Sequence, residues 1–128
     1  MLSLEGLLNR YEKGTIDLVK IDIEGAEIMV LDSCPDAVLK RIGQLTVEFH
    51  ESIGMTSSAE IEKVTVRLQS LGFAWIRGTF SNFEDNLFIN RALCPLSDWE
   101  LFCNRTVFRM WNGLRRFAHR ALIPIKRR

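Results

Sequence analysis

The 128-residue chain lacks several features that would assign it to a class at once. No apolar run approaches the roughly 18 residues of a membrane span. No two of the eight glycines lie closer than six residues, so the chain has no G-x-G phosphate-binding loop. The three cysteines match no metal or redox spacing, and we expect reduced, buried or half-buried thiols. These absences speak against a membrane-spanning protein, a disulfide framework and a glycine-rich nucleotide site.

The composition is that of one globular domain. At 47% hydrophobic residues the chain can bury a core, and it is neither disordered nor collagenous. The N-terminus lacks a basic leader and carries Glu5 inside its first apolar stretch, which makes it a poor signal peptide. We therefore expect a cytoplasmic protein.

Helical and strand patterns alternate along the chain. Helices are predicted at 2–13, 25–33 and 57–72, with a helical turn from Pro35, and strands at 16–23, 44–50, 73–80 and 86–91. This order predicts an α/β fold in which parallel strands are joined by right-handed crossovers and the last two strands form an antiparallel hairpin.

Three of these segments have specific patterns. The run at 16–23 is mainly apolar and partly β-branched, which is typical of a strand covered on both faces. Apolar and polar residues alternate in 44–50, so one face of that strand is predicted to point inward. Ser57 and Glu60 have the spacing of a capping box at the start of the third long helix.

Acidic side chains and a histidine stand where the first two strands end. Asp22 closes the first predicted strand, and Glu24 and Gly25 open the next helix. Glu48 and His50 end the second strand. In parallel sheets, ligands bind beyond the carboxyl ends of the strands. The sequence therefore predicts a functional site at this edge of the sheet.

Structural explanations compete with the functional one. A helix dipole favours carboxylates near its N-terminus, which accounts for Glu24 and Glu27 and is our preferred explanation for Glu27. Asp22 lies in an apolar stretch and needs a partner, which is Lys20, a backbone N–H, a metal or a ligand. For Lys20 we expect a structural role, and for His50 a structural and a functional role stay equally open.

The stretches "IDLVKIDIEGAEIMVLDS", "LTVEFHE", "LGF" and "NLFINR" together resemble the C-terminal half of FkbM-type S-adenosylmethionine (SAM)-dependent methyltransferases. The most specific motif, K-I-D-x-E-G-A-E, stands at residues 20–27, and V-E-x-H stands at Val47, Glu48 and His50. The resemblance implies that residues 1–92 are part of a class I, Rossmann-like methyltransferase sheet and supply its last four strands, and that 93–128 form a separate C-terminal tail.

The resemblance also implies a reaction, which is methyl transfer from SAM to a hydroxyl of a sugar or a natural-product-like acceptor. In that assignment Asp22, Glu48 and His50 are catalytic, and Glu24 and Gly25 contact the cofactor. No metal is required, and the alternative is a divalent ion held by Asp22, Glu48 and His50. The family's glycine-rich cofactor loop belongs to its N-terminal half. We therefore expect the chain to self-associate or to need that half as a partner.

The C-terminal tail has a charge of its own. Residues 105–128 hold eight Lys/Arg and no acid, whereas residues 1–104 hold nine basic and sixteen acidic residues, a net charge of −7. On a helical wheel the tail is amphipathic, so it either packs on the sheet or lies on an anionic membrane as a peripheral anchor. A second hypothesis follows, in which the chain is a non-catalytic methyltransferase remnant that acts as a membrane-surface or protein-interaction module. No nucleic-acid partner is expected, because no known motif is present.

Overall fold

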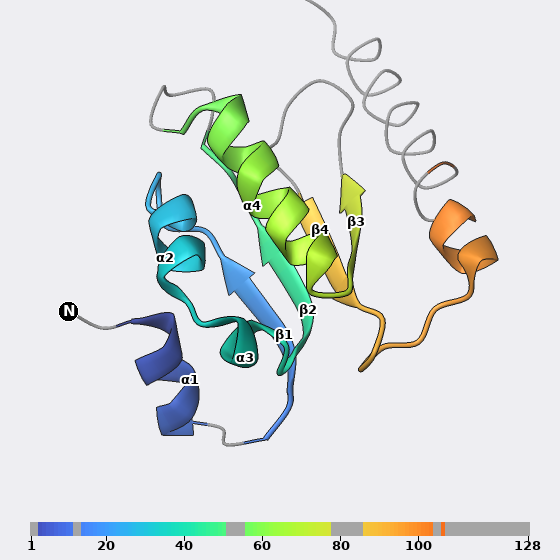
Figure 1. Cartoon of the computed structure of the whole chain (residues 1–128), viewed down its shortest axis with the longest axis horizontal. Helices are drawn as coiled ribbons and strands as arrows, with labels where there is room; N and C mark the ends of the chain where they lie inside the picture. The colour runs from blue at the N-terminus through green and yellow to red at the C-terminus, as the bar shows by residue number, and fades with distance from the viewer. Residues whose placement is uncertain (1–2, 12–13, 51–55, 78–85, 104–105, 107–128) are drawn as a thin grey trace, which may run out of the picture.

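The computed structural model describes residues 3–11, 14–50, 56–77, 86–103 and 106 (Figure 1). The elements are α1 (Leu4–Tyr11), β1 (Ile16–Ile21), α2 (Glu27–Ser33), α3 (Asp36–Leu39), β2 (Ile42–Val47), α4 (Ser58–Ser70), β3 (Phe73–Arg77) and β4 (Asn86–Asn90). Residues 98–103 are also helical. The predicted alternation of helices and strands is therefore confirmed.

The strands form one mixed sheet in the order β1-β2-β4-β3. β1 and β2 are parallel, while β4 runs antiparallel to both β2 and β3. The predicted parallel pair and the antiparallel C-terminal hairpin are both confirmed, and the sheet is consistent with part of a Rossmann-like fold. Because β1 and β2 are parallel, their carboxyl ends meet at one edge, where Ile21 is paired with Val47.

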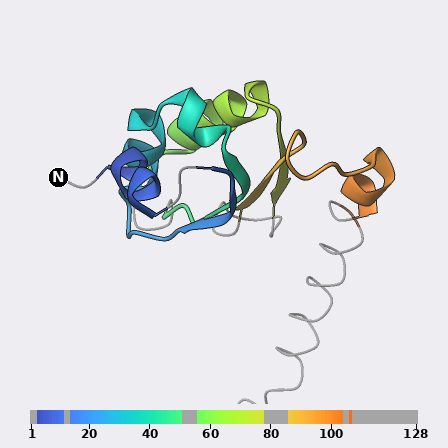
Figure 2. The same ribbon diagram turned by 90° about the horizontal axis from the view of Figure 1, so that it is seen from below.

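Helices α1 to α4 lie on one face of this sheet, as the view from below makes clear (Figure 2). The alternation predicted for the second strand is confirmed, because Leu45, Val47 and Phe49 are buried in the main core. The capping box of Ser57 and Glu60 is present at the start of α4. Three apolar residues of α4 complete the core beneath it, namely Ile61, Val64 and Leu68.

The first strand differs from its prediction. A strand covered on both faces was expected, but one face of β1 is exposed. Among the described residues, β1 pairs only with β2. Leu18, which alternates with the core-facing Val19, is 56% exposed. The strand also ends at Ile21 and not at residue 23, which leaves Asp22 in the turn that follows.

The other face of β3 and β4 carries a smaller apolar cluster. Ala74, Ile76 and Ile89 pack there with Leu101 from the helical turn at 98–103. Of the three cysteines, Cys34 is buried and Cys94 and Cys103 are half-buried, and all are free thiols, as expected. None of the helices in the described part of the chain is long and apolar enough to span a bilayer. Residues 107–128, which hold most of the predicted basic helix, lie outside the described residues.

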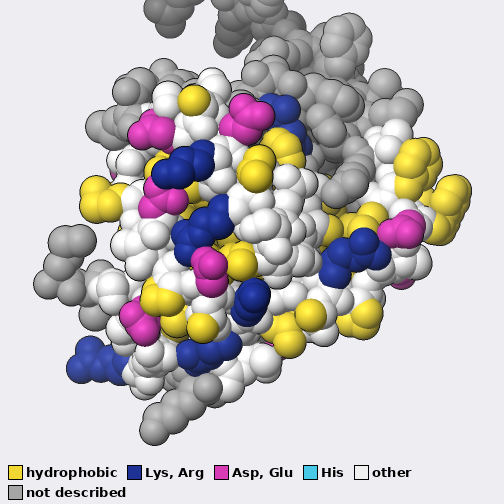
Figure 3. Space-filling view, viewed as in Figure 1, with side chains coloured by type: hydrophobic (Ala, Val, Ile, Leu, Met, Phe, Trp, Pro, Cys, Tyr) yellow, Lys and Arg dark blue, Asp and Glu magenta, His cyan; other side chains and the backbone are white. Residues whose placement is uncertain are grey.

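On the helix-covered face, basic and acidic side chains are interspersed (Figure 3). One ion pair there joins three elements. Arg67 of α4 pairs with Asp36 of α3 and donates hydrogen bonds to the backbone carbonyls of Leu31 and Cys34, both at 2.7 Å. The C-terminal end of α2 is thereby fixed to α4.

Candidate functional site

The candidate site begins with the turn that follows β1. Glu24 (φ 54°) and Gly25 (φ 102°) both adopt left-handed backbone conformations, and helix α2 starts two residues later at Glu27. Gly25 tolerates this conformation because it has no Cβ. For Glu24 it is unfavourable and has to be held by the surrounding contacts.

The contacts that hold the turn come from Glu27, whose side chain is completely buried. Its carboxylate accepts hydrogen bonds from the backbone N–H groups of Ile23 and Gly25, each at 3.1 Å. A buried carboxylate without partners would be very costly, so these bonds are a condition of the fold. The helix-dipole explanation predicted for Glu27 is therefore incomplete, because this side chain closes the turn.

The second contribution comes from the segment after β2. The Nδ1 atom of His50 lies 2.9 Å from Oε1 of Glu27. Its other ring nitrogen, Nε2, lies 3.4 Å from Oε2 of Glu24 and 4.0 Å from Oδ1 of Asp22. The His50 side chain is only 16% exposed. Its ring lies between the buried Glu27 and the exposed carboxylates of Asp22 and Glu24 at the carboxyl edge of the parallel strands.

These contacts shift the pKa values of both partners. Burial alone lowers the pKa of His50, but the hydrogen bond and charge of Glu27, with the charges of Glu24 and Glu48, raise it above the usual 6.5. Burial alone raises the pKa of Glu27. The backbone N–H groups of Gly25, Glu27 and Ile23 and the hydrogen bond from His50 outweigh burial and place this pKa below the usual 4.5. These shifts favour the ionised form of Glu27 and the protonated form of His50.

Asp22 pairs with Lys20, one of the partners considered from the sequence. Its Oδ2 lies 2.8 Å from Nζ of Lys20. The hydrogen bond from Lys20 is the main cause that lowers the pKa of Asp22, with smaller contributions from the charges of Lys20 and His50. Although Asp22 follows an apolar stretch, both Asp22 and Lys20 are exposed.

Glu48 follows the last residue of β2. Its backbone N–H bonds to the carbonyl of Ile21 and joins the two strand ends. Among the described residues, the group that could hold a metal ion is Asp22, Glu24 and His50, whose ligand atoms all lie within 4.8 Å of one another. Glu48, the third member of the predicted metal-ligand set, is not part of this group, and the predicted divalent ion stays a prediction.

The two residues predicted to contact the cofactor, Glu24 and Gly25, could contribute in different ways. The carboxylate of Glu24 is 81% exposed and can accept hydrogen bonds from the hydroxyls of a ribose. The N–H of Gly25 already donates to Glu27 and is not available to a ligand. Because Gly25 has no side chain, however, a ligand can approach its backbone closely. For a metal, two carboxylates and an imidazole suit a divalent transition ion better than Mg²⁺, which prefers oxygen.

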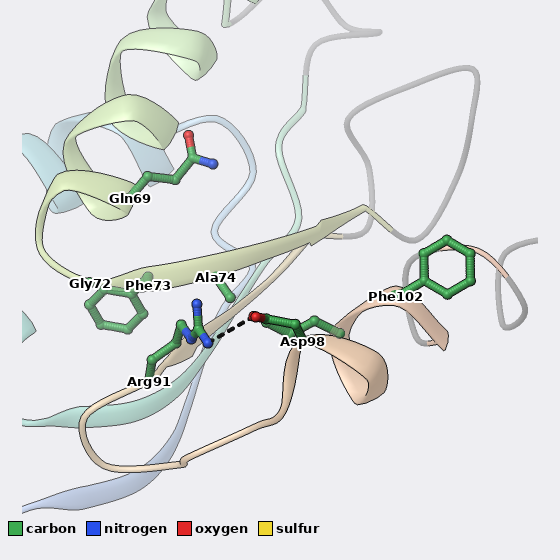
Figure 4. Close-up of a pocket in the computed structure, with 8 residues that line it drawn as sticks. Gln69, Gly72, Phe73, Ala74, Arg91, Asp98 and Phe102 are labelled. Atoms are coloured by element: carbon green, nitrogen blue, oxygen red, sulfur yellow. Dashed lines mark hydrogen bonds and ion pairs between the residues drawn. The ribbon is translucent and has the colours of Figure 1, made fainter.

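A pocket lies beside β3, the strand at the other end of the sheet from β1. It has a volume of about 460 Å³, and the ion pair of Arg91 and Asp98 stands beside its apolar wall (Figure 4). Phe73 and Leu101 belong to its lining. None of the predicted site residues contributes to this pocket.

Comparison with known proteins identifies a family model that matches the chain. The family model described as the methyltransferase FkbM domain matches residues 1–74. This range extends from α1 into β3 and includes Asp22, Glu24, Glu27 and His50. No curated protein and no solved structure gives a significant match to the chain.

Proposed function

From the premise that the chain belongs to the methyltransferase FkbM family, we propose that it transfers a methyl group from SAM to a hydroxyl of a sugar or a natural-product-like acceptor. The observation that carries this proposal is the convergence of His50, Asp22 and Glu24 at the carboxyl edge of the parallel strands. That edge is where ligands bind in sheets of this kind.

The chemistry needs a base and a defined geometry. SAM, when bound, supplies an electrophilic methyl group on a sulfonium. Nε2 of His50 would take the proton of the acceptor hydroxyl while that oxygen forms its bond to the methyl carbon. The carbon–sulfur bond would break at the same time, and S-adenosylhomocysteine would leave. Asp22, which lies 4.0 Å from Nε2, stabilises the imidazolium that results. Proton transfer by a positioned side chain contributes typically about 10²- to 10⁴-fold in rate.

The remaining residues of the site bind the cofactor or set the charge around Asp22 and His50. Glu24 accepts hydrogen bonds from ribose hydroxyls of the cofactor, and the turn at Gly25 lets the cofactor approach the backbone. Lys20 neutralises Asp22 in the resting protein through its 2.8 Å ion pair. Glu48 contributes negative charge that favours protonated His50.

The test uses the full 128-residue chain and its two histidines. SAM binding is measured by calorimetry, and transfer of a labelled methyl group is measured with a panel of sugars and polyols. We expect His50→Gln to lower the transfer rate by about 10²-fold or more, whereas His119→Gln, the matched control in the tail, leaves it unchanged. No SAM binding and no transfer by the unsubstituted chain would contradict the proposal.

A second candidate function is favoured by the surface near the tail. Trp99 and Phe102 stack on each other with ring centroids 5.7 Å apart, and Trp99 is 71% exposed. Exposed aromatic rings beside a basic segment are typical of helices that lie in a membrane interface. In this alternative the chain is a non-catalytic module that binds anionic membranes through 105–128. Failure to co-sediment with anionic vesicles would reject it.

A further inference from the structure

We propose that Glu27 is a positioning residue that fixes the ring of His50 and determines which of its two nitrogens acts as the base. The inference rests on the proposed function, because it assigns to His50 the removal of the acceptor's proton. Glu27 itself is completely buried and is not exposed at the carboxyl edge of the strands.

The first argument is that the carboxylate of Glu27 joins the two halves of the site. Its two oxygens accept hydrogen bonds from Ile23 and Gly25, in the turn after β1, and contact His50, which follows β2. The turn that carries Glu24 and the segment that carries His50 are thereby fixed to one buried group. Displacing this carboxylate would move both.

The second argument concerns the tautomer of His50. An ionised carboxylate only accepts hydrogen bonds, so the nitrogen beside Glu27 has to carry a proton. Nδ1 of His50 is that nitrogen, at 2.9 Å. The proton that leaves and returns is therefore the one on Nε2, which faces Asp22 and Glu24. A buried carboxylate orients the catalytic histidine in the same way in Ser-His-Asp triads.

The third argument compares the charges that surround His50. Asp22 and Glu24 face it from the turn after β1, Glu48 lies on its own segment, and Glu27 faces it from α2. Asp22 is already paired with Lys20, and Glu24 is exposed to solvent, which screens its charge. Glu27 is completely buried and makes the shortest contact, so its charge acts most strongly on the ring.

The experiment is the substitution Glu27→Gln in the full chain, which keeps the size of the side chain and removes its charge. Nitrogen-15 NMR of the histidine rings reports the tautomer and the titration midpoint of His50, and His119→Gln assigns the two signals. In the unsubstituted chain we expect neutral His50 to carry its proton on Nδ1. In Glu27→Gln we expect a lower midpoint and a mixture of tautomers.

Methyl transfer gives a second readout. We expect Glu27→Gln to lower kcat by about 10²-fold or more while KM changes by less than about threefold, because the proton acceptor is misplaced and the substrates still bind. The pH at which the rate reaches its plateau should also fall with the midpoint of His50. A shift in the NMR signals without methyl transfer in any variant would contradict the proposed function and leave the orientation of His50 by Glu27 supported.

The matched control is Glu60→Gln. Glu60 also accepts hydrogen bonds from a backbone N–H and a side chain, at the start of α4, but makes no contact with His50. We expect this variant to lose some stability and to keep the tautomer and midpoint of His50. A folded Glu27→Gln variant with unchanged His50 signals would overturn the proposal. If Glu27→Gln does not fold, Glu27→Asp, which withdraws the carboxylate by one methylene, is judged by the same signals.

Discussion

At the scale of single residues, the pair of His50 and Glu27 makes stability depend on pH. The pKa of His50 is raised above 6.5, so its contribution is complete below that value and is lost as pH rises through the raised pKa. The pKa of Glu27 is lowered below 4.5, so its contribution is present above 4.5 and is lost as pH falls through the lowered pKa. We expect the stability difference between the unsubstituted chain and His50→Gln, measured by urea unfolding, to be largest between about pH 4.5 and 6.5. A difference that does not vary with pH would contradict this assignment.

The sequence predicted which residues meet at the strand ends but not how they are paired. Asp22, Glu24 and His50 could be predicted because each follows a strand in a local pattern, and Lys20 was a candidate partner of Asp22 two residues away. The role of Glu27 depends on a contact with His50 across 23 residues of sequence, and the local pattern offered the helix dipole as a sufficient explanation.

At the scale of elements, the C-terminal end of α2 depends on a side chain from another helix. α2 has no basic residue in its last turn, and Arg67 of α4 bonds to the carbonyls of Leu31 and Cys34 instead. We expect Arg67→Ala to lower the free energy of unfolding by about 2 kcal/mol, because these charge-assisted bonds are lost. Urea denaturation with Lys63→Ala as control checks this.

Lys63 is a suitable control because it lies on the same helix. It pairs with Asp32 at 3.5 Å, in an exposed ion pair, and such pairs contribute about 0–1 kcal/mol. Equal losses in the two variants would show that the carbonyl contacts of Arg67 do not stabilise α2. The capping box of α4 could be predicted from sequence because its residues are three apart, whereas the contacts of Arg67 span more than thirty residues.

At the scale of the whole molecule, the apolar composition of β1 predicted a strand covered on both faces, whereas one of its faces is exposed. In the order β1-β2-β4-β3 the strand has one neighbour among the described residues, and helices cover one of its faces. Composition indicates how much a strand can bury. It does not indicate whether both faces are covered, because that depends on chain segments remote from the strand itself.

The open edge of β1 leads to a prediction about association. An exposed apolar edge strand is a template for pairing with another chain, and charged side chains normally oppose this. In β1 the charge of Lys20 is paired with Asp22, and Leu18 is 56% exposed. We therefore expect the chain to sediment as concentration-dependent oligomers in analytical ultracentrifugation, and Leu18→Lys to shift it toward monomer. Val66→Lys, at a residue of α4 that is 57% exposed, should have no such effect. A cooperatively unfolding monomer at all concentrations would refute the prediction, and an equal effect of both substitutions would remove β1 as the cause.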